Sequence, residues 1–155
     1  MPRTEWMART TGDDRFAAWG DEARAVIQLA MENAQRQGSL RIGLRDLALA
    51  VSRASSVRIL HARIGLDPEA ISTAMTTLPI TRFGRGPVGS LTRDGREAVA
   101  AARPIATALG LLTVRPVHLW LSVLLRAPVQ SALSRHGMAA DSIRKSIEGR
   151  ASGDD

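Results

Sequence analysis

The sequence contains no cysteine and only one lysine, Lys145, among its 155 residues. Without cysteine the chain can form no disulfide, no thiolate metal site and no cysteine nucleophile. The phosphate-binding loop of many ATPases requires the pattern Gly-x-x-x-x-Gly-Lys-Ser/Thr, and the residues before Lys145 do not match it. We therefore expect no ATP hydrolysis through such a loop.

Long apolar runs are absent as well. No stretch approaches the roughly 18 uninterrupted apolar residues of a membrane-spanning helix. The segment from Met1 to Asp14 lacks the continuous apolar stretch of a secretory signal. The composition, 45% hydrophobic and 23% charged, is typical of a globular protein. These features predict a cytoplasmic protein with no membrane partner, and its length suits one compact domain.

The formal net charge is +6, and almost every cation is an arginine. Excess arginine is compatible with a nucleic-acid or acidic-protein partner. It is also what the codon usage of a GC-rich genome produces, and no block of five or six like charges occurs. An arginine-rich, nucleic-acid-binding regulator is therefore the alternative hypothesis rather than the leading one.

The strongest positive signal is an internal repeat with one constant offset, which relates Gly38 to Gly110 and Ile42 to Val114. In a repeat protein each copy is one structural unit that buries its apolar face on its neighbour. We predict one compact domain with five parts: a flexible leader at 1–15, a first repeat at 16–78, a Pro/Gly linker at 79–90, a second repeat at 91–148 and a polar tail at 149–155.

The apolar residues of both copies recur three and four positions apart, which is typical of helices with one buried face. No segment shows the sustained alternation of a strand. The sequence therefore predicts an all-α fold of about eight helices in two pseudo-symmetric four-helix repeats. Pro104 lies inside the helix expected over residues 92–109, and it predicts a bend or a new helix start near Arg103.

The first copy resembles the N-terminal repeat domain of Clp-type unfoldase chaperones, the ClpA and ClpC class. Its matching residues are Trp19-Gly-Asp-Glu-Ala23-Arg-Ala-Val26-Ile27-Gln-Leu-Ala30, followed by Ile42-Gly43-Leu-Arg-Asp-Leu47. In the second copy the likeness runs from Leu91 through Gly110 to Leu119. The resemblance implies the two-repeat fold and the recruitment of substrates or adaptors to an ATP-driven unfoldase.

Because the sequence has no ATPase motif, the resemblance implies a stand-alone, non-catalytic accessory, adaptor or decoy in Clp-dependent proteolysis. The partners it implies are a Clp unfoldase, its adaptors or its substrate proteins, and peptide-like small molecules are a further ligand class. We expect a monomer. No cofactor, metal or catalytic residue is expected, since His61, His118 and His136 lack the spacing of metal ligands.

The resemblance also implies an apolar groove between the first helices of the two repeats, where peptides would bind. Its expected residues are Phe16, Arg24, Ile27, Met31, Leu91, Thr92 and Arg96. ClpC-type domains also recognise phosphorylated arginine through a Thr and a Glu in each repeat. Those positions hold Gly20 and Arg45 in the first copy, and Thr92 and Val117 in the second. Without the carboxylate a guanidinium loses its bidentate partner, so we expect no phosphoarginine recognition.

Overall fold

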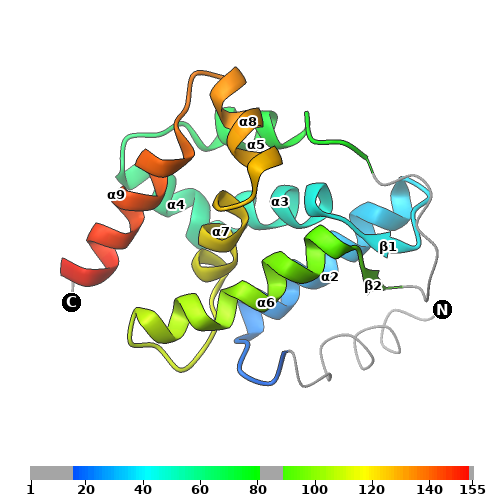
Figure 1. Cartoon of the computed structure of the whole chain (residues 1–155), viewed down its shortest axis with the longest axis horizontal. Helices are drawn as coiled ribbons and strands as arrows, with labels where there is room; N and C mark the ends of the chain where they lie inside the picture. Colours follow the sequence, from blue (N-terminus) through cyan, green and yellow to red (C-terminus); the bar gives the residue numbers. More distant parts are fainter. Residues whose placement is uncertain (1–15, 81–88, 154–155) are drawn as a thin grey trace.

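The computed structural model describes residues 16–80 and 89–153, with side chains up to residue 150. These residues form eight α-helices and two strands of two residues each, which confirms the predicted all-α fold (Figure 1). The elements are α2 (Asp21–Arg36), β1 (Arg41–Ile42), α3 (Leu44–Ser52), α4 (Ser55–Arg63), α5 (Pro68–Met75), β2 (Ser90–Leu91), α6 (Arg93–Ala108), α7 (Pro116–Leu124), α8 (Ala127–Arg135) and α9 (Ala140–Gly153).

The predicted leader at 1–15 lies outside the described residues, and so do residues 81–88 of the predicted linker at 79–90. The helix α9 continues to Gly153 and so extends into residues 149–155, the predicted polar tail. Within the described part of the chain, no helix is both long and apolar enough to cross a membrane.

The repeat is visible in the helix bounds themselves. The constant offset that relates Gly38 to Gly110 also carries both ends of α2, α3 and α4 onto those of α6, α7 and α8, and the start of α5 onto that of α9. The helix-terminating glycines follow the same rule. Gly38 and Gly110 have φ angles of 78° and 81°, and Gly65 and Gly137 have 83° and 75°. Glycine adopts this left-handed conformation without the steric cost of a Cβ atom, so it ends each helix at the same point of both copies.

The two repeats are joined reciprocally where each copy enters its first helix. Ile42 of β1 pairs in parallel with Leu91 of β2, and an isolated bridge joins Trp19 to Val114. The repeat offset relates Trp19 to Leu91 and Ile42 to Val114. The Trp19–Val114 and Leu91–Ile42 pairs are therefore equivalent contacts, one made by each repeat. Such reciprocity is the property of a two-fold interface. The structure is therefore one pseudo-symmetric unit rather than two independent repeats.

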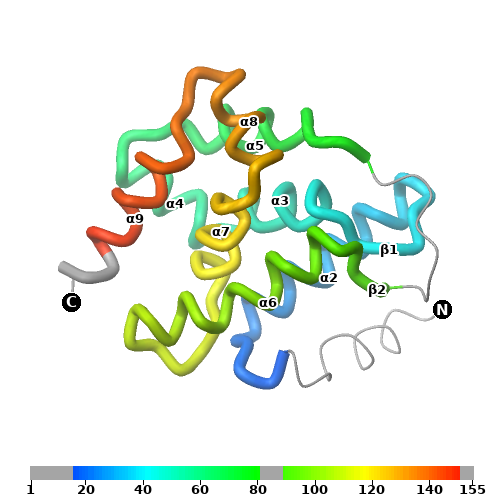
Figure 2. Tube along the Cα trace, in the orientation of Figure 1, coloured from blue at the N-terminus to red at the C-terminus, as the bar shows by residue number. Residues whose placement is uncertain are grey.

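The centre of the molecule is occupied by α3 and α7, which are equivalent under the repeat (Figure 2). Eight of the nine residues of each helix are buried. A helix that is covered on all sides must be apolar nearly all round, as both sequences are. Figure 2 shows α4 and α9 toward one end of the trace and the short strands toward the other.

The helix α6 is a single element despite Pro104, so the new helix start allowed by the sequence does not occur. Pro104 cannot donate the backbone hydrogen bond that the carbonyl of Ala100 would accept. Both residues are exposed, and water can therefore reach that carbonyl. The helix continues because the missing bond is on its solvent side.

Gly95 marks a close approach of α6 to β1. A Cβ atom added there would lie 2.9 Å from the carbonyl oxygen of Ile42, which is backbone and cannot rotate away. We expect Gly95→Ala to lower the free energy of unfolding by about 1–3 kcal/mol through overpacking. Gly149→Ala is the matched control. Its Cβ meets no described atom within 4 Å, and it should gain up to about 1 kcal/mol. Urea unfolding measures both, and equal stability of the two variants would contradict the prediction.

Candidate ligand-binding cavity

The apolar residues of the predicted groove lie in the hydrophobic core. Phe16 and Ile27 are fully buried, and Met31 and Leu91 are each 2% exposed. All four belong to the core cluster in which the two repeats pack together. A ligand could reach them only if the repeats separated, so the groove stays a prediction that needs a second conformation.

The polar residues of the predicted groove do not converge on one point. Arg24 donates from Nε to the carbonyl oxygen of Trp19 at 3.0 Å and from Nη2 to that of Phe16 at 2.8 Å. Thr92 caps α6, because its Oγ1 accepts from the backbone N–H of Gly95 at 3.2 Å. Arg96 is exposed. Two of these three side chains therefore hold the backbone in place.

A cavity of about 550 Å³ lies instead where elements of both repeats meet. Its volume falls within the roughly 300–1,000 Å³ of typical ligand pockets. The lining comes from the start of α2, from α4, from the loop before α7 with the first turn of α7, and from α9. The lining residues are Gly20, Asp21, Glu22, Ala23, Ser56, Ile59, Leu60, Arg63, Thr113, Val114, Arg115, Pro116, Val117, Ile147 and Arg150.

The N-termini of α2 and α7 contribute to this cavity, and α4 lines it from Ser56 to Arg63. Gly20 is the N-cap of α2, and no described side chain caps that helix, whereas Thr92 caps the equivalent α6. Glu22 caps the N-terminus of α4, because its Oε1 accepts from Ser56 Oγ at 2.7 Å and from the Ser56 backbone N–H at 3.4 Å. A helix N-terminus carries about half a positive charge. The backbone therefore places positive potential at the α2 and α7 sides of the cavity, whereas the Glu22 carboxylate compensates the N-terminus of α4.

Three arginines reinforce that potential, each from a different element. Arg63 ends α4, Arg115 is the N-cap of α7, and Arg150 lies in α9. Arg150 also donates from Nη2 to the carbonyl oxygen of Arg63 at 3.2 Å, which ties α9 to the end of α4. Among the described residues, neither Arg63 nor Arg115 forms an ion pair with a carboxylate.

The pseudo-symmetry places a second, smaller cavity of about 280 Å³ at the start of α6. Its lining includes Thr92 and Arg45, whereas the larger cavity includes Gly20 and Val117. In each repeat, the position matched to the ClpC threonine (Gly20 or Thr92) therefore shares a cavity with the position matched to the ClpC glutamate in the other repeat (Val117 or Arg45). The sequence comparison paired these positions within each copy, and the structure pairs them across copies because the repeats interlock.

The second cavity is partly filled by its own chain. Leu78, Pro79 and Ile80 line it. Leu78 is equivalent under the repeat to Arg150, which lines the larger cavity. Arg45 replaces the smaller Val117 and donates from Nε to the carbonyl oxygen of Thr76 at 3.3 Å. The larger cavity is therefore the better candidate for a ligand.

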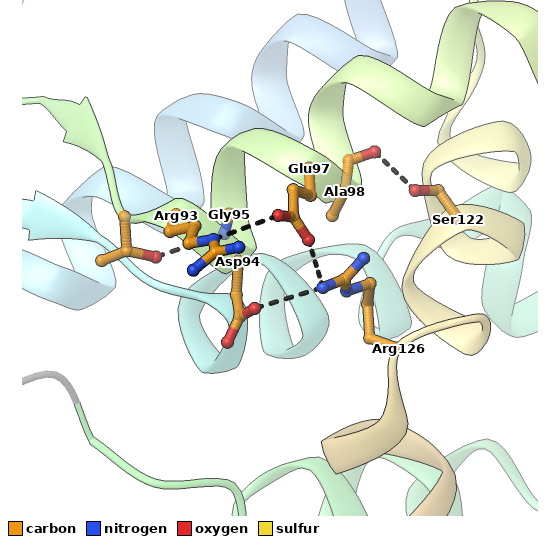
Figure 3. Close-up of polar contacts among 8 residues, drawn as sticks. Arg93, Asp94, Gly95, Glu97, Ala98, Ser122 and Arg126 are labelled. Atoms are coloured by element: carbon orange, nitrogen blue, oxygen red, sulfur yellow. Dashed lines mark hydrogen bonds and ion pairs between the residues drawn. The ribbon is translucent and has the colours of Figure 1, made fainter.

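The polar network of Figure 3 fastens α6 to α7 and α8. Arg126, the N-cap of α8, binds Asp94 at 3.2 Å and also binds Glu97, so it bridges two carboxylates of α6. This guanidinium holds the pKa of Glu97 below its usual range. Ser122 Oγ donates to the carbonyl oxygen of Ala98 at 2.5 Å.

Ser122, His118 and Asp94 do not form a Ser–His–Asp triad in this structure, because each side chain is bound to another group. His118 Nδ1 accepts from the backbone N–H of Arg115 at 2.9 Å and so holds the first turn of α7. Burial, reinforced by the Arg115 cation, lowers the pKa of His118 to about 4. The equivalent residue of α3 is Asp46, whose Oδ2 accepts from the backbone N–H of Gly43 at 2.9 Å.

His61 of α4 is buried, and neither of its ring nitrogens has a hydrogen-bond partner among the described residues. Its ring meets that of Trp120 edge-on, with centroids 5.2 Å apart. Burial lowers the pKa of His61 to about 4. Within the described ranges, no group of three or more His, Asp or Glu residues is arranged to hold a metal ion.

Three chains are among the solved structures that share this architecture. The N-terminal domain of Hsp104 from Candida albicans aligns with a TM-score of 0.73 and 19% identity, covering 86% of this chain and 92% of that one. The N-terminal domain of the caseinolytic protease associated chaperone ClpD from Arabidopsis thaliana aligns at 0.68 and 12%, covering 89% and 97%. A chain from a study of a malarial protein secretion system aligns at 0.71 and 12%, covering 86% and 94%.

Sequence comparisons alone identify no relative. No protein-family model matches the chain, and no curated protein matches it in sequence. The structural likeness nevertheless covers 86–89% of the chain. The chain therefore has the fold of a Clp N-terminal domain, as the resemblance of its repeats predicted.

Proposed function

We propose that this chain is a non-catalytic module that binds proteins or peptides, acting in the cytoplasm as an accessory, adaptor or decoy in Clp-dependent proteolysis. The observation that carries the proposal is its fold, which matches the N-terminal domains of Hsp104 and ClpD over 86% and 89% of the chain. Fold alone does not fix function. The proposal therefore also needs a site on this chain, and the cavity of about 550 Å³ is our candidate for it.

The cavity suits a peptide side chain because its polar rim surrounds an apolar floor. Ala23 and Ile147 are buried beneath it, and Leu60 and Val117 are half-buried. Ile59 lies at the rim with 53% of its surface exposed. Exposed apolar residues grouped with a concave surface are typical of binding sites. A protein segment would cover Ile59 and insert one side chain beside Val117.

The direct test is whether the chain captures Clp unfoldase, its adaptors or a chemically unfolded model protein, and whether capture depends on the cavity. We expect Ile59→Asp to weaken binding about tenfold, since a charge placed in a desolvated apolar contact costs at least about 1.4 kcal/mol. Leu125→Asp is the matched control. Leu125 is 51% exposed but does not line the cavity. Equal binding by both variants would place the binding surface elsewhere.

The nucleic-acid alternative loses support from the ion pairs of the surface. Arg58 binds Glu69, Arg126 binds two carboxylates, and Arg144 binds Asp141 and Glu148. Such pairs reduce the number of arginines available to phosphates. A gel-shift assay at low salt tests the alternative directly, and a retained complex with a steep salt dependence would revive it.

A further inference from the structure

We propose that the larger cavity, the one beside Gly20 and Val117, selects acidic peptides in which carboxylates flank an apolar side chain that enters the cavity. The apolar side chain would contact Leu60 and Val117, and the carboxylates would meet Arg63, Arg115 and Arg150 at the rim. This inference rests on the proposed function, because it assumes that the module binds peptides, and it adds the class of peptide.

The backbone provides the first reason. Two helices, α2 and α7, contribute their N-terminal residues to the cavity, whereas α4 lines it along one face from Ser56 to Arg63. Their first N–H groups have no partner within the helix, and each N-terminus favours a negative charge. The N-cap of α2 is Gly20, which has no side chain to accept from those N–H groups, although Asp21 and Glu22 already place negative charge in the first turn.

The side chains provide the second reason, although they include opposing charges. Three arginines and two carboxylates, Asp21 and Glu22, line the cavity. Glu22 is already bound to Ser56 at 2.7 Å and so acts as the cap of α4. Neither Arg63 nor Arg115 has a carboxylate partner among the described residues. The formal charge of the lining is therefore positive, and these two exposed guanidinium groups can form charge-assisted hydrogen bonds with a ligand.

The lining also favours a peptide over a single-stranded nucleic acid. Proteins that bind single strands stack the bases on aromatic side chains. Among the described residues that line this cavity none is aromatic, and its floor is aliphatic. Such a floor accommodates a Leu- or Ile-sized side chain, for which burial is favourable at about 25 cal/mol per Å². The combination of this floor with a cationic rim matches an apolar residue between two acidic ones.

The experiment measures the anisotropy of a dye-labelled peptide with the sequence Gly-Ser-Glu-Asp-Leu-Glu-Asp-Ser-Gly. Its isosteric amide version replaces each Glu by Gln and each Asp by Asn. We expect the acidic peptide to bind at least tenfold more tightly at low salt, and added salt to reduce the difference. The variant Arg63→Gln/Arg115→Gln should reduce the preference to less than twofold. The control Arg103→Gln/Arg135→Gln removes two exposed arginines that do not line the cavity and should keep it.

The outcomes separate this inference from the proposed function. Equal binding of the acidic and amide peptides, with both lost in Ile59→Asp, would overturn the acidic preference and leave peptide binding intact. An acidic preference that survives Arg63→Gln/Arg115→Gln would also overturn the inference. No binding of either peptide, together with no capture of unfolded protein, would overturn the proposed function itself. Displacement of the acidic peptide by an equimolar deoxythymidine oligonucleotide would assign the arginines to phosphate instead.

Discussion

Lowering the pH from 7 to 4 is expected to reduce the free energy of unfolding by about 3 kcal/mol for each of two histidines, His61 and His118. The pKa of each falls from 6.5 to about 4 in the folded protein. A pKa difference of one unit corresponds to about 1.4 kcal/mol. The two effects add if the sites do not interact. The sum approaches the total stability of many domains of this size, which is about 5–15 kcal/mol.

The sign of the effect follows from which state binds the proton. Below pH 6.5 the unfolded chain protonates its histidines, while the folded chain keeps both neutral until about pH 4. Proton binding therefore favours the unfolded state throughout that interval. The stabilising contribution of the neutral rings is complete above pH 6.5 and is lost progressively as the pH falls from 6.5 to about 4. At still lower pH both states are protonated, and these two groups cause no further loss.

His61 is the better residue for testing this effect, because no hydrogen bond to a described residue complicates its removal. Both of its ring nitrogens are buried without such a partner. The equivalent position of the second repeat is Leu133, which is also fully buried. His61→Leu should therefore fit, and it should remove about 3 kcal/mol of the acid-dependent loss.

The measurement is urea unfolding at several values between pH 4 and pH 7.5, for the wild type and His61→Leu. The control is His136→Leu, because His136 is exposed at the end of α8. It should reproduce the pH profile of the wild type. Asp46 works in the opposite direction, since burial raises its pKa and acidification then favours the folded state. A pH profile of His61→Leu that parallels the wild type would show that His61 is protonated without unfolding.

The repeat made much of the fold predictable from the sequence. Gly38 and Gly110 end equivalent helices. The apolar residues spaced three and four apart are the buried residues of α2, namely Ala23, Val26, Ile27, Ala30, Met31 and Ala34. Such features can be predicted from the sequence, because helix caps and apolar periodicity depend on residues that are only a few positions apart. The continuity of α6 through Pro104 was not predictable. It depends on which side of the helix faces water, and tertiary packing decides that.

The ligand cavity was harder to predict, and the reason is the reciprocity of the two repeats. Gly20 and Val117 are far apart in sequence and come from different copies, yet they line one cavity. Comparison within each copy could not pair them. Arg63 and Arg150 are 87 residues apart in sequence and meet through one hydrogen bond between α9 and the end of α4. The apolar residues assigned to the predicted groove lie in the hydrophobic core. An apolar residue at such a position is equally typical of a core and of an apolar groove, so the sequence pattern alone does not distinguish them.

Trp120→Ala is expected to lower the free energy of unfolding by about 3–5 kcal/mol, as is typical of truncating a buried indole. Trp120 is fully buried in α7, which packs against α2, α3, α4, α6, α8 and α9. Its equivalent on α3 is Ala48, also fully buried. The indole therefore fills space at the centre of the molecule that the first repeat leaves to small side chains. Truncation would leave small residues at both positions and a cavity between the repeats.

Trp120→Phe separates the loss of packing from the loss of the indole N–H. That N–H is buried and has no hydrogen-bond partner in the described part of the chain, so removing it sacrifices no bond. A phenyl ring also keeps an aromatic edge for His61, whose centroid lies 5.2 Å away. We expect Trp120→Phe to cost about 1–2 kcal/mol, less than Trp120→Ala, because the phenyl ring leaves a smaller cavity than a methyl group does. Urea unfolding of both variants at pH 7 decides the matter. A loss below about 1.5 kcal/mol in Trp120→Ala would show that the repeats collapse onto the vacated space, so that the centre of this fold is less tightly packed than its burial implies.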